Sequence, residues 1–539
     1  MSGGPSRRAV LSGAAVGIAA AGLRGSASAS AAGGSDRDGD EYDGTGLDPT
    51  LTAPPLPVPA NSALHLLRRV THGPAPVDWE ALTQAGGLTE YLDAQLADMP
   101  DVITDAQVRT RFPYAELPPA AVHAALGPNW DPTAMRQVAL AHTFRQLVSS
   151  RQLYEQVVDV FYNRLNVPAN GEDGPWSLPD YYAQVIRKHA YGKYADMVLA
   201  SATHGAMLDY LSASESTKHN PNENLGRELL ELHTVGLGAR YTETDVKKAA
   251  LALTGLTTAA DGSMTYNAAS HYVGGLRVLR WAHPNKTAAG GQAVVASLVN
   301  YLTRHPACAR RVASALATRF VCDKPPRDLL DAMQHAYLAN DTAIVPTLRA
   351  MFAHKAFEQW KGRKLRRPHQ QALAAARCLS VGADPAQPTG TDGTSRLWFS
   401  MGSLGDAPLT HAAPDGHPDL AMWWLSTSSR LAAPRWSVLA TGGWGAGLSN
   451  PDAAVLRPTD SYATQGAVWS PATSVTPRQL VQACARRMLG QSLPSAQVDI
   501  VVKGVGLSPT APPALLISYD AALEAIYALL AAHPQHTVR

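Results

Sequence analysis

The sequence predicts a mainly α-helical protein, and three observations support this fold class. Apolar residues recur at helical spacing over long intervals, whereas runs with clear period-two alternation are scarce. Two helix starts carry legible capping residues. With 539 residues, of which 45% are hydrophobic and 17% charged, the chain can bury a large core. We therefore expect a large multi-helix body.

Residues 1–29 have the order of parts that is typical of a twin-arginine signal peptide. Arg7 and Arg8 precede a weakly apolar stretch rich in alanine and glycine, and Ala27-Ser28-Ala29 offers the small residues at which a signal peptidase cleaves. The apolar stretch is too short to span a bilayer as a helix. We predict export by the twin-arginine route to an extracytoplasmic or secreted location, with no membrane span in the mature chain.

Residues 30–61 form a predicted linker, because their serine, glycine, aspartate and proline bury too little apolar surface to become ordered. The folded body begins near Ser62 with a helix that breaks at Gly73-Pro74, and a second helix follows from Val77. Residues 133–165 lack glycine, and their apolar residues recur at helical spacing over most of the interval. They predict a long amphipathic helix, or two helices in succession.

The remaining helices are expected between irregular segments. After a loop at 163–179, helical patterns occur at Tyr181, near Ala195, within 294–357, and at 370–379, 478–489 and 519–532. Residues 389–476 are irregular and rich in glycine and proline, and they include Trp423, Trp424, Trp436 and Trp444. We divide the body into a helical domain at 62–380 and, at 381–539, an irregular segment with C-terminal helices packed on the same body.

One legible helix start lies at residues 220–223. Asn220 stands as a capping residue before Pro221 at the first helical position, and Glu223 can satisfy amides of the first turn. The sequence predicts a helix that runs from here to Val235 and stops at Gly236.

The second legible start follows closely. Thr242 is the expected capping residue and Asp245 its reciprocal partner, while Tyr241 and Val246 form a hydrophobic staple. We predict that this helix ends at Gly255.

Charge and cysteine content exclude several classes of function. The formal net charge of +2 gives no general reason to expect nucleic acid as a partner. The four cysteines, which are Cys308, Cys322, Cys378 and Cys484, are scattered and form no C-x-x-C pair. This spacing argues against a zinc ribbon and against a dense disulfide framework, but leaves one or two disulfide bonds open. No G-x-S-x-G, H-E-x-x-H or Walker motif is present.

The residues that best suit catalysis lie on the first capped helix. Glu228 and Glu231 are three apart and would share one face of an α-helix, with Arg227 beside them, which suits acid–base work or metal binding. His233, Asp245 and His271 are candidates to complete a metal site with the two glutamates.

A structural interpretation of the same helix competes with this catalytic one and is favoured over it. Glu223, Arg227 and Glu231 are spaced by four, and they form an exposed ladder of ion pairs in this interpretation. The leucines at 225, 229 and 232 would then face the core. A segment so rich in asparagine, glutamate and arginine can equally clamp neighbouring helices through charged hydrogen bonds.

Two further features have a functional and a structural interpretation. The basic run at 361–367 is a candidate contact for an anionic envelope polymer, although such a run is usually a solvated helix start. Trp423 and Trp424 are candidates to stack on sugar rings, although packing in the core is the better prediction.

Several motifs together resemble one bacterial family. They are the segments 222–236, 241–246 and 253–255, the opening at 64–69 with Gly73-Pro74, and His305-Pro306 with 320–326. In these segments the chain is similar to the DUF1800 family, a domain of unknown function, from about Ser62 to at least Leu379. The resemblance implies an exported protein and a second exported protein as partner, but it implies no established activity, substrate or cofactor.

The chain departs from the family pattern at two places. The run at 161–166 contains no histidine where members commonly have one, and His271-Tyr272 stands in place of a His-Asp pair. If those histidines bind a metal in relatives, the site is changed here. We therefore expect either an extracytoplasmic enzyme that uses paired carboxylates, with or without a metal, or a non-catalytic envelope partner of another exported protein.

Overall fold

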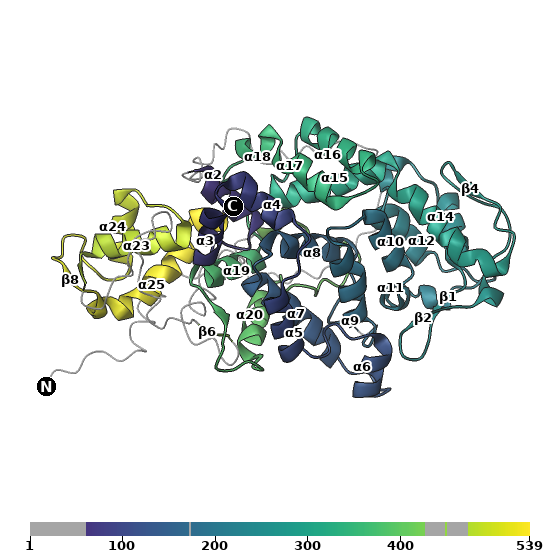
Figure 1. Cartoon of the computed structure of the whole chain (residues 1–539), viewed down its shortest axis with the longest axis horizontal. Coiled ribbons are helices and arrows are strands. Elements are labelled where there is room, and N and C mark those ends of the chain that lie inside the picture. Colours follow the sequence, from purple (N-terminus) through teal and green to yellow (C-terminus); the bar gives the residue numbers. More distant parts are fainter. Residues whose placement is uncertain (1–60, 172–173, 426–447, 450–472) are drawn as a thin grey trace, which may run out of the picture. The chain divides into compact units, whose positions relative to one another are not determined.

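The computed structural model describes residues 61–171, 174–425, 448–449 and 473–539, and most of these residues are helical (Figure 1). The prediction of a mainly α fold is therefore confirmed. The predicted signal peptide, all of the linker before Asn61, Trp436 and Trp444 lie outside the described residues.

The strands in the described part of the chain form antiparallel pairs of two. They are β1 (Leu256–Thr258) with β2 (Met264–Tyr266), β3 (Leu276–Val278) with β4 (Trp281–His283), β5 (Gly382–Ala383) with β6 (Leu448–Ser449), and β7 (Ser474–Val475) with β8 (Ala514–Leu515).

The first helix of the described residues begins at Ser62, where the sequence predicts a helix. Asn61 caps the first helix, because its side-chain oxygen accepts the amide of Leu64 at 2.8 Å. The break at Gly73 has a packing cause as well as a conformational one. Its φ is +151°, and a Cβ there would lie 2.3 Å from the Cα of Ala374. The N-terminal helices are α2 (Ser62–Val70), α3 (Pro76–Ala85), α4 (Leu88–Leu96), α5 (Val102–Arg111) and α6 (Pro119–Leu126).

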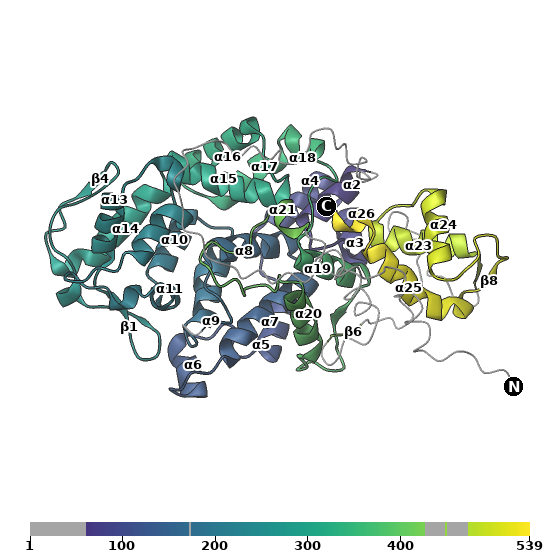
Figure 2. The ribbon, with the colours of Figure 1, turned by 180° about the vertical axis from the view of Figure 1, so that it is seen from behind.

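The long helical interval is two helices, α7 (Thr133–Val148) and α8 (Gln152–Arg164). Helix α8 is not amphipathic in the expected sense, because every residue from Gln152 to Tyr162 is buried. Its buried polar residues are paired instead of solvated. Glu155, for example, receives two hydrogen bonds from Arg187, at 2.7 and 3.0 Å. Helix α8 is thus a central element of the fold, and Figures 1 and 2 show it between other helices in both views.

The segment after α8 alternates α- and π-helical turns. It contains α9 (Leu178–Asp180), the π-helix η1 (Tyr181–Arg187), α10 (Tyr194–Ala202), α11 (Gly205–Tyr210), α12 (Asn224–Glu228), the π-helix η3 (Leu229–His233) and α13 (Glu243–Leu253).

One of the two helix starts predicted here is wrong by three residues. Helix α12 begins at Asn224, and Asn220 does not cap it. The Asn222 side chain accepts the amide of Asn224 at 2.9 Å and donates to the carbonyl of Ser212 at 2.9 Å, which holds the preceding residues in a turn. The start of α13 is as predicted, since Thr242 and Asp245 form a reciprocal capping box.

The helices from residue 291 onward complete the body. They are α14 (Gly291–Thr303), α15 (Pro306–Phe320), α16 (Arg327–Ala339), α17 (Ile344–Phe352), α18 (Lys355–Gln359), α19 (Pro368–Cys378), α20 (Asp392–Ser403), α21 (Ala421–Trp424), α23 (Pro477–Leu489), α24 (Ser495–Gly504), α25 (Asp520–Ala531) and α26 (Pro534–Thr537).

The apolar side chains form two clusters. The first cluster takes residues from α2 to α18 and includes most of α8, η1 and α15. The second cluster joins α5, α7 and α19 to α23, α24 and α25. Helix α19 is buried along its whole length and connects the early part of the chain to the C-terminal helices. Figures 1 and 2 show α19 between α7 and α23 in both views.

Most of the basic run at 361–367 is not solvated, since Arg363 is exposed and Lys361 half-buried while its other basic side chains are buried. Lys364, Arg366 and Arg367 are all buried, and each is bonded to other groups of the protein, which offsets the cost of burying its charge. Lys364 pairs with Asp323 at 2.5 Å, and Arg367 pairs with Asp406. The anionic partners come from the chain itself.

The same run pairs with the C-terminal residues. Leu365 and Val538 form an antiparallel bridge, the amide of Arg366 donates to Thr537, and the amide of Arg539 donates to Lys364. The Arg366 guanidinium also donates to the carbonyls of His536 and Val538. These contacts explain how the Arg366 guanidinium is buried against backbone carbonyls instead of a carboxylate.

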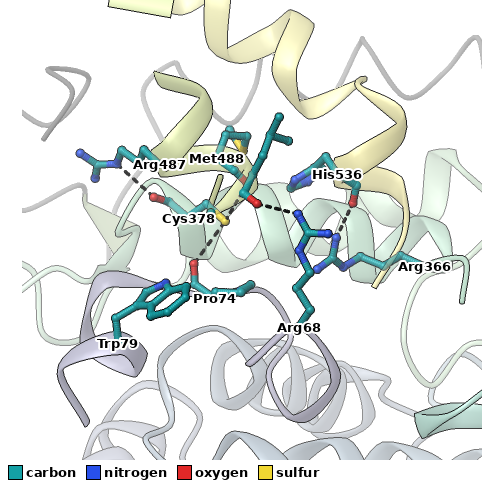
Figure 3. Close-up of a pocket in the computed structure, with 10 residues that line it drawn as sticks. Arg68, Pro74, Trp79, Arg366, Cys378, Arg487, Met488 and His536 are labelled. Atoms are coloured by element: carbon teal, nitrogen blue, oxygen red, sulfur yellow. Dashed lines mark hydrogen bonds between the residues drawn. The ribbon is translucent and has the colours of Figure 1, made fainter. Parts of the chain in front are cut away.

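A small cavity lies where α2, α19 and α23 meet (Figure 3). Arg68 donates to the carbonyl of Leu489, Arg487 donates to the carbonyl of Cys378, and the Cys378 thiol contacts the carbonyl of Pro74. The cavity measures about 10 Å³, which is room for one water molecule. It is a junction between the two hydrophobic clusters.

Two further expectations concern cysteines and membranes. All four cysteines are described, all are buried, and no disulfide joins them. No helix among the described residues is both long and apolar enough to cross a bilayer.

Candidate functional site

The paired glutamates of the signature do not share an α-helical face. Glu228 is the last residue of α12, and Glu231 lies in the π-helix η3. A π-turn bonds residue i to i+5, so the spacing rule for an α-helix fails across this junction. Glu231 accepts the hydroxyl of Tyr241 at 2.9 Å. The two carboxylates therefore have different surroundings.

Arg227 has a structural role in this segment. Its guanidinium donates to both carboxylate oxygens of Glu243, at 2.8 and 2.6 Å, and lies 3.5 Å from Glu223. The bidentate bond ties α12 to α13. The predicted ladder is thus correct for Glu223 and Arg227, while Glu231 turns to Tyr241 instead.

The five proposed metal ligands are not gathered into one site. Asp245 accepts amides from Thr242 and Leu279, at 2.8 and 2.7 Å. His271 bonds the carbonyl of Thr254 and the side chain of Asn285. Among the described residues, no group of three or more His, Cys, Asp or Glu side chains is placed to hold a metal ion. Asp245 and His271 serve the local fold in this structure.

Glu228 keeps one property of a proton donor. Its side chain is half-buried, and burial together with the negative charge of Glu231 raises the pKa of the Glu228 carboxyl. The charge of Asp415 contributes in the same direction, so Glu228 lies near the segment that contains Asp415.

An open pocket of about 450 Å³ lies beside this segment. Its wall combines α8, η3, α15 and residues 415–420. The apolar part of the wall is Val160, Leu232, Ala315, Pro418 and Leu420, and its charged or polar part is Asn163, Arg164, Arg311, Ser314, Thr318, Arg319, Asp323, Asp415, His417 and Asp419. The volume lies within the range of small-molecule sites. We call it the α8–α15 pocket.

Two arginines on one side of the pocket are held by the signature segment. Arg164 donates through Nε to the hydroxyl of Tyr194 at 2.8 Å, and that hydroxyl donates to the carbonyl of His233 at 2.6 Å. Arg311 packs against Gly236, whose φ is +69° and where a Cβ would lie 2.2 Å from the Arg311 Nη1. Glycine is required there for its backbone conformation and for the space that the guanidinium occupies.

A charged network fixes another part of the wall. Arg319 pairs with Asp159 of α8 at 2.7 Å and with Asp419, and Lys364 lies between Asp419 and Asp323. Burial alone would raise the pKa of Asp419, but the charges of Arg319 and Lys364 hold it well below its usual range. Asp419 is therefore ionised, and the positive charges of Arg319 and Lys364 neutralise it within the wall.

His417 lies in this wall and is supported by α8. Its amide donates to the Asn163 side chain at 2.7 Å, and the Asn163 amide group donates back to the His417 carbonyl at 2.7 Å. The preceding Gly416 has a φ of +71°, and a Cβ there would lie 2.0 Å from the carbonyl of Asn163. Asn163 therefore sets the backbone position of His417.

The His417 imidazole is neutral at ordinary pH. Burial and then the charge of Arg367 lower the pKa of His417 to about 4, and Asp406 is 3.9 Å from its Nδ1. Its Nε2 is buried and has no hydrogen-bond partner among the described residues. Three arginine atoms of the pocket wall share this property, namely Arg164 Nη2, Arg311 Nε and Arg319 Nη1. Such atoms also occur elsewhere in the described core, for example Arg69 Nε and His72 Nε2, but in the wall of an open pocket a ligand can supply the partner.

Sequence patterns do not reveal this pocket as a whole. His417 and Arg311 belong to no recognisable motif, and their segments are distant from the signature in the chain. The run at 161–166, which differs from the family pattern, is the one available clue, since it supplies Asn163 and Arg164.

The comparisons with known proteins identify the family. A family model described as a protein of unknown function (DUF1800) matches residues 65–536. The chain therefore belongs to the DUF1800 family, as the resemblance of its motifs indicates. Neither the curated proteins nor the solved structures contain a match to this chain.

Proposed function

We propose that this member of the DUF1800 family is an exported, extracytoplasmic enzyme and that the α8–α15 pocket is its active site. The observation that carries the proposal is a neutral, buried histidine in the wall of a pocket of about 450 Å³. In this proposal His417 accepts a proton from the substrate or from water, and Glu228, which is close to Asp415 but does not itself line the pocket, returns one.

The environments of the two groups suit these opposite roles. His417 is deprotonated at neutral pH because burial disfavours its charged form, whereas Glu228 holds its proton more tightly than an ordinary glutamate. A pKa of about 4 makes His417 a weak base in the empty pocket. A negative charge on a bound ligand would raise that pKa and so strengthen the base.

Acid–base catalysis can be tested on the purified mature protein. A panel of esters, glycosides, amides and phosphoesters is screened with the wild type, with His417→Asn and with the control His335→Asn, whose side chain is exposed on α16. We expect one class to be turned over, with a loss of at least about 100-fold in His417→Asn and no change in His335→Asn. Equal rates in all three proteins would refute the assignment.

Export is tested separately. The proposed twin-arginine signal requires both Arg7 and Arg8. We expect the wild type to leave the cytoplasm and the Arg7→Lys, Arg8→Lys double variant to stay there, measured by cell fractionation. Equal export of both proteins would contradict the twin-arginine route.

A second candidate function is a non-catalytic partner of another exported protein. The observation that favours it is a group of exposed apolar side chains at α21, where Met422, Trp423 and Leu425 are 57%, 63% and 50% exposed. Trp423 is therefore not a core residue, in contrast to the expectation. Trp424 is half-buried, and its indole donates to the carbonyl of Pro418 at 2.7 Å.

The partner hypothesis predicts a different sensitivity to mutation. Replacing Met422 and Trp423 with serine should abolish co-purification with an exported protein, while His417→Asn should leave it intact. Co-purification that survives the double serine variant would count against this surface.

A further inference from the structure

We infer that Arg164 and Arg311 form a recognition site for an oxyanion, a carboxylate or a phosphate group, on the small molecule that the α8–α15 pocket takes. The inference rests on the proposed function, because it names the chemical class of ligand for the same pocket. Four observations support it.

The first observation is the absence of acidic partners. Arg319 in the pocket wall pairs with Asp159 and Asp419, whereas Arg164 and Arg311 form no ion pair in the part of the chain that the structure describes. Their recorded hydrogen bonds go to the Tyr194 hydroxyl and to the carbonyl of Leu232, at 2.8 and 3.4 Å. A guanidinium that is held only by neutral groups keeps its full charge for a ligand.

The second observation is the proximity of the two positive charges. Burial and then the charge of Arg164 lower the pKa of Arg311 to about 10. Burial, with the charges of Arg164 and Arg311, lowers the pKa of His233 to about 3. His233 is therefore neutral and adds no charge of either sign. Two like charges held together at a partly buried wall are unfavourable until an anion lies between them.

The third observation concerns the acids nearby, of which Asp323 and Asp419 are paired with cations and Asp415 is 63% exposed to solvent. Lys364 and Arg319 neutralise Asp323 and Asp419, and Asp415 pairs with His411 at 3.1 Å. The negative charge of Glu231 acts to raise the pKa of Arg311, but the Glu231 carboxylate already accepts a hydrogen bond from the hydroxyl of Tyr241.

The fourth observation is the set of unpaired donors. Arg164 Nη2 and Arg311 Nε are buried without a hydrogen-bond partner among the described residues, as is Nη1 of Arg319, a residue that is 1% exposed. An oxyanion offers several acceptor lone pairs and can satisfy more than one of these donors at once. The apolar wall formed by Val160, Leu232 and Leu420 would contact the rest of the ligand.

The inference is tested by calorimetric titration of the purified full-length mature protein. The probes are phenyl phosphate and benzoate, which place an oxyanion on an apolar ring, and benzyl alcohol as the neutral analogue. We expect at least one anionic probe to bind, and to bind more weakly as salt is raised, whereas benzyl alcohol does not bind. Whichever anion binds more tightly identifies the oxyanion as phosphate or carboxylate.

The matched variants are Arg311→Gln and Arg310→Gln, which are neighbours on α15. Arg310 pairs with Asp331 and does not line the pocket. We expect Arg311→Gln to weaken binding of the anion by at least about tenfold, Arg164→Gln to do the same, and Arg310→Gln to change nothing. If Arg164→Gln fails to fold, Arg311→Gln decides, since Arg311 is half-buried at the pocket edge.

The outcomes separate this inference from the proposed function. Binding of benzyl alcohol as tight as that of the anions, or unchanged binding in Arg311→Gln, overturns the oxyanion site. Probe binding does not require turnover. An anion that binds through these arginines to a protein without activity would remove the proposed enzyme and leave the oxyanion site in place.

Discussion

The signature segment at 222–245 and the α8–α15 pocket differ in how their polar residues are used. In the signature most polar side chains are already satisfied, as the bidentate bond from Arg227 to Glu243 and the capping box of Asp245 show. In the pocket wall several buried nitrogens lack a partner among the described residues. The signature, which is dense in charged residues, therefore uses most of its polar groups in the fold, and His233 Nε2 is its one buried side-chain atom without a hydrogen-bond partner among the described residues.

The two regions are nevertheless connected. The carbonyl of His233 receives the Tyr194 hydroxyl that in turn holds Arg164, and Gly236 leaves the space in which Arg311 lies. The end of the signature thus positions the two arginines of the pocket. Its contribution to function would be indirect, through the backbone at its C-terminal end.

The largest expected effect is a loss of stability, and it comes from the buried ion pair that supports Arg319 of the pocket wall. Asp159→Asn leaves Arg319 and His142 with one less anionic partner in the core, and we expect a loss of about 3–5 kcal/mol in the free energy of unfolding. The control in the signature is Glu223→Gln, at a partly exposed ion pair, with an expected loss below about 1 kcal/mol. Urea unfolding measures both. Similar losses would mean that the two regions do not differ in this way.

The second prediction separates the paired glutamates. If Glu228 donates the proton, Glu228→Gln should lower turnover by about 100-fold, because glutamine cannot supply it. Glu231→Gln should change turnover little, since Glu231 is engaged with Tyr241. Steady-state rates on the substrate class found by the screen measure the difference. Equal losses of turnover in both variants would indicate that the two glutamates act together.

The third prediction tests the link between signature and pocket. Gly236→Ala places a side chain on a residue with φ of +69° and against the Arg311 guanidinium, so we expect a loss of about 1–2 kcal/mol and weaker binding of anionic probes. Gly238→Ala is the control, because a Cβ there meets nothing within 4 Å. Thermal unfolding and titration with phenyl phosphate measure both effects. Unchanged binding in Gly236→Ala would show that the signature does not position Arg311.

The fourth prediction concerns pH. The folded-state pKa values of His233 and His417 are lowered to about 3 and about 4, so the unfolded chain binds more protons as pH falls below about 6.5. Stability is therefore present at neutral pH and is lost between about pH 6.5 and 4. Each such histidine contributes up to about 1.4 kcal/mol per pH unit. The free energy of unfolding, measured with urea over this pH range, should depend less steeply on pH in His417→Asn than in the wild type. An equal pH dependence in both proteins would mean that His417 is not buried as a neutral group.

The predictable part of this fold is the part that local rules govern. The helices α7 and α8 follow the apolar pattern, which left one long helix or two in succession open. The capping box at Thr242 follows from residue types at fixed spacing. The prediction for the start of α12 was wrong because the Asn222 side chain bonds Ser212 and Asn224, which holds the residues before Asn224 in a turn. The π-helix η3 has no local sequence rule, and it separates two glutamates that α-helical spacing places together.

Long-range contacts explain the rest of what the sequence did not reveal. From the sequence alone, the basic run at 361–367 is typical of a surface segment. In the structure Asp323 and Asp406 form ion pairs with it. His417 carries no motif, and its position depends on Asn163, which is 254 residues earlier in the chain. Burial and pairing across such separations are properties of the folded body and not of any local pattern.

The pairing of the basic run with residues 537–539 has a kinetic consequence. The Arg539 guanidinium donates to Gln156 on α8, a contact that spans 383 residues, and to the carbonyl of Arg319. Contacts of such high sequence separation form slowly, because a long loop must close first. The centre of the body can therefore be completed only after residues 536–539 have been synthesised.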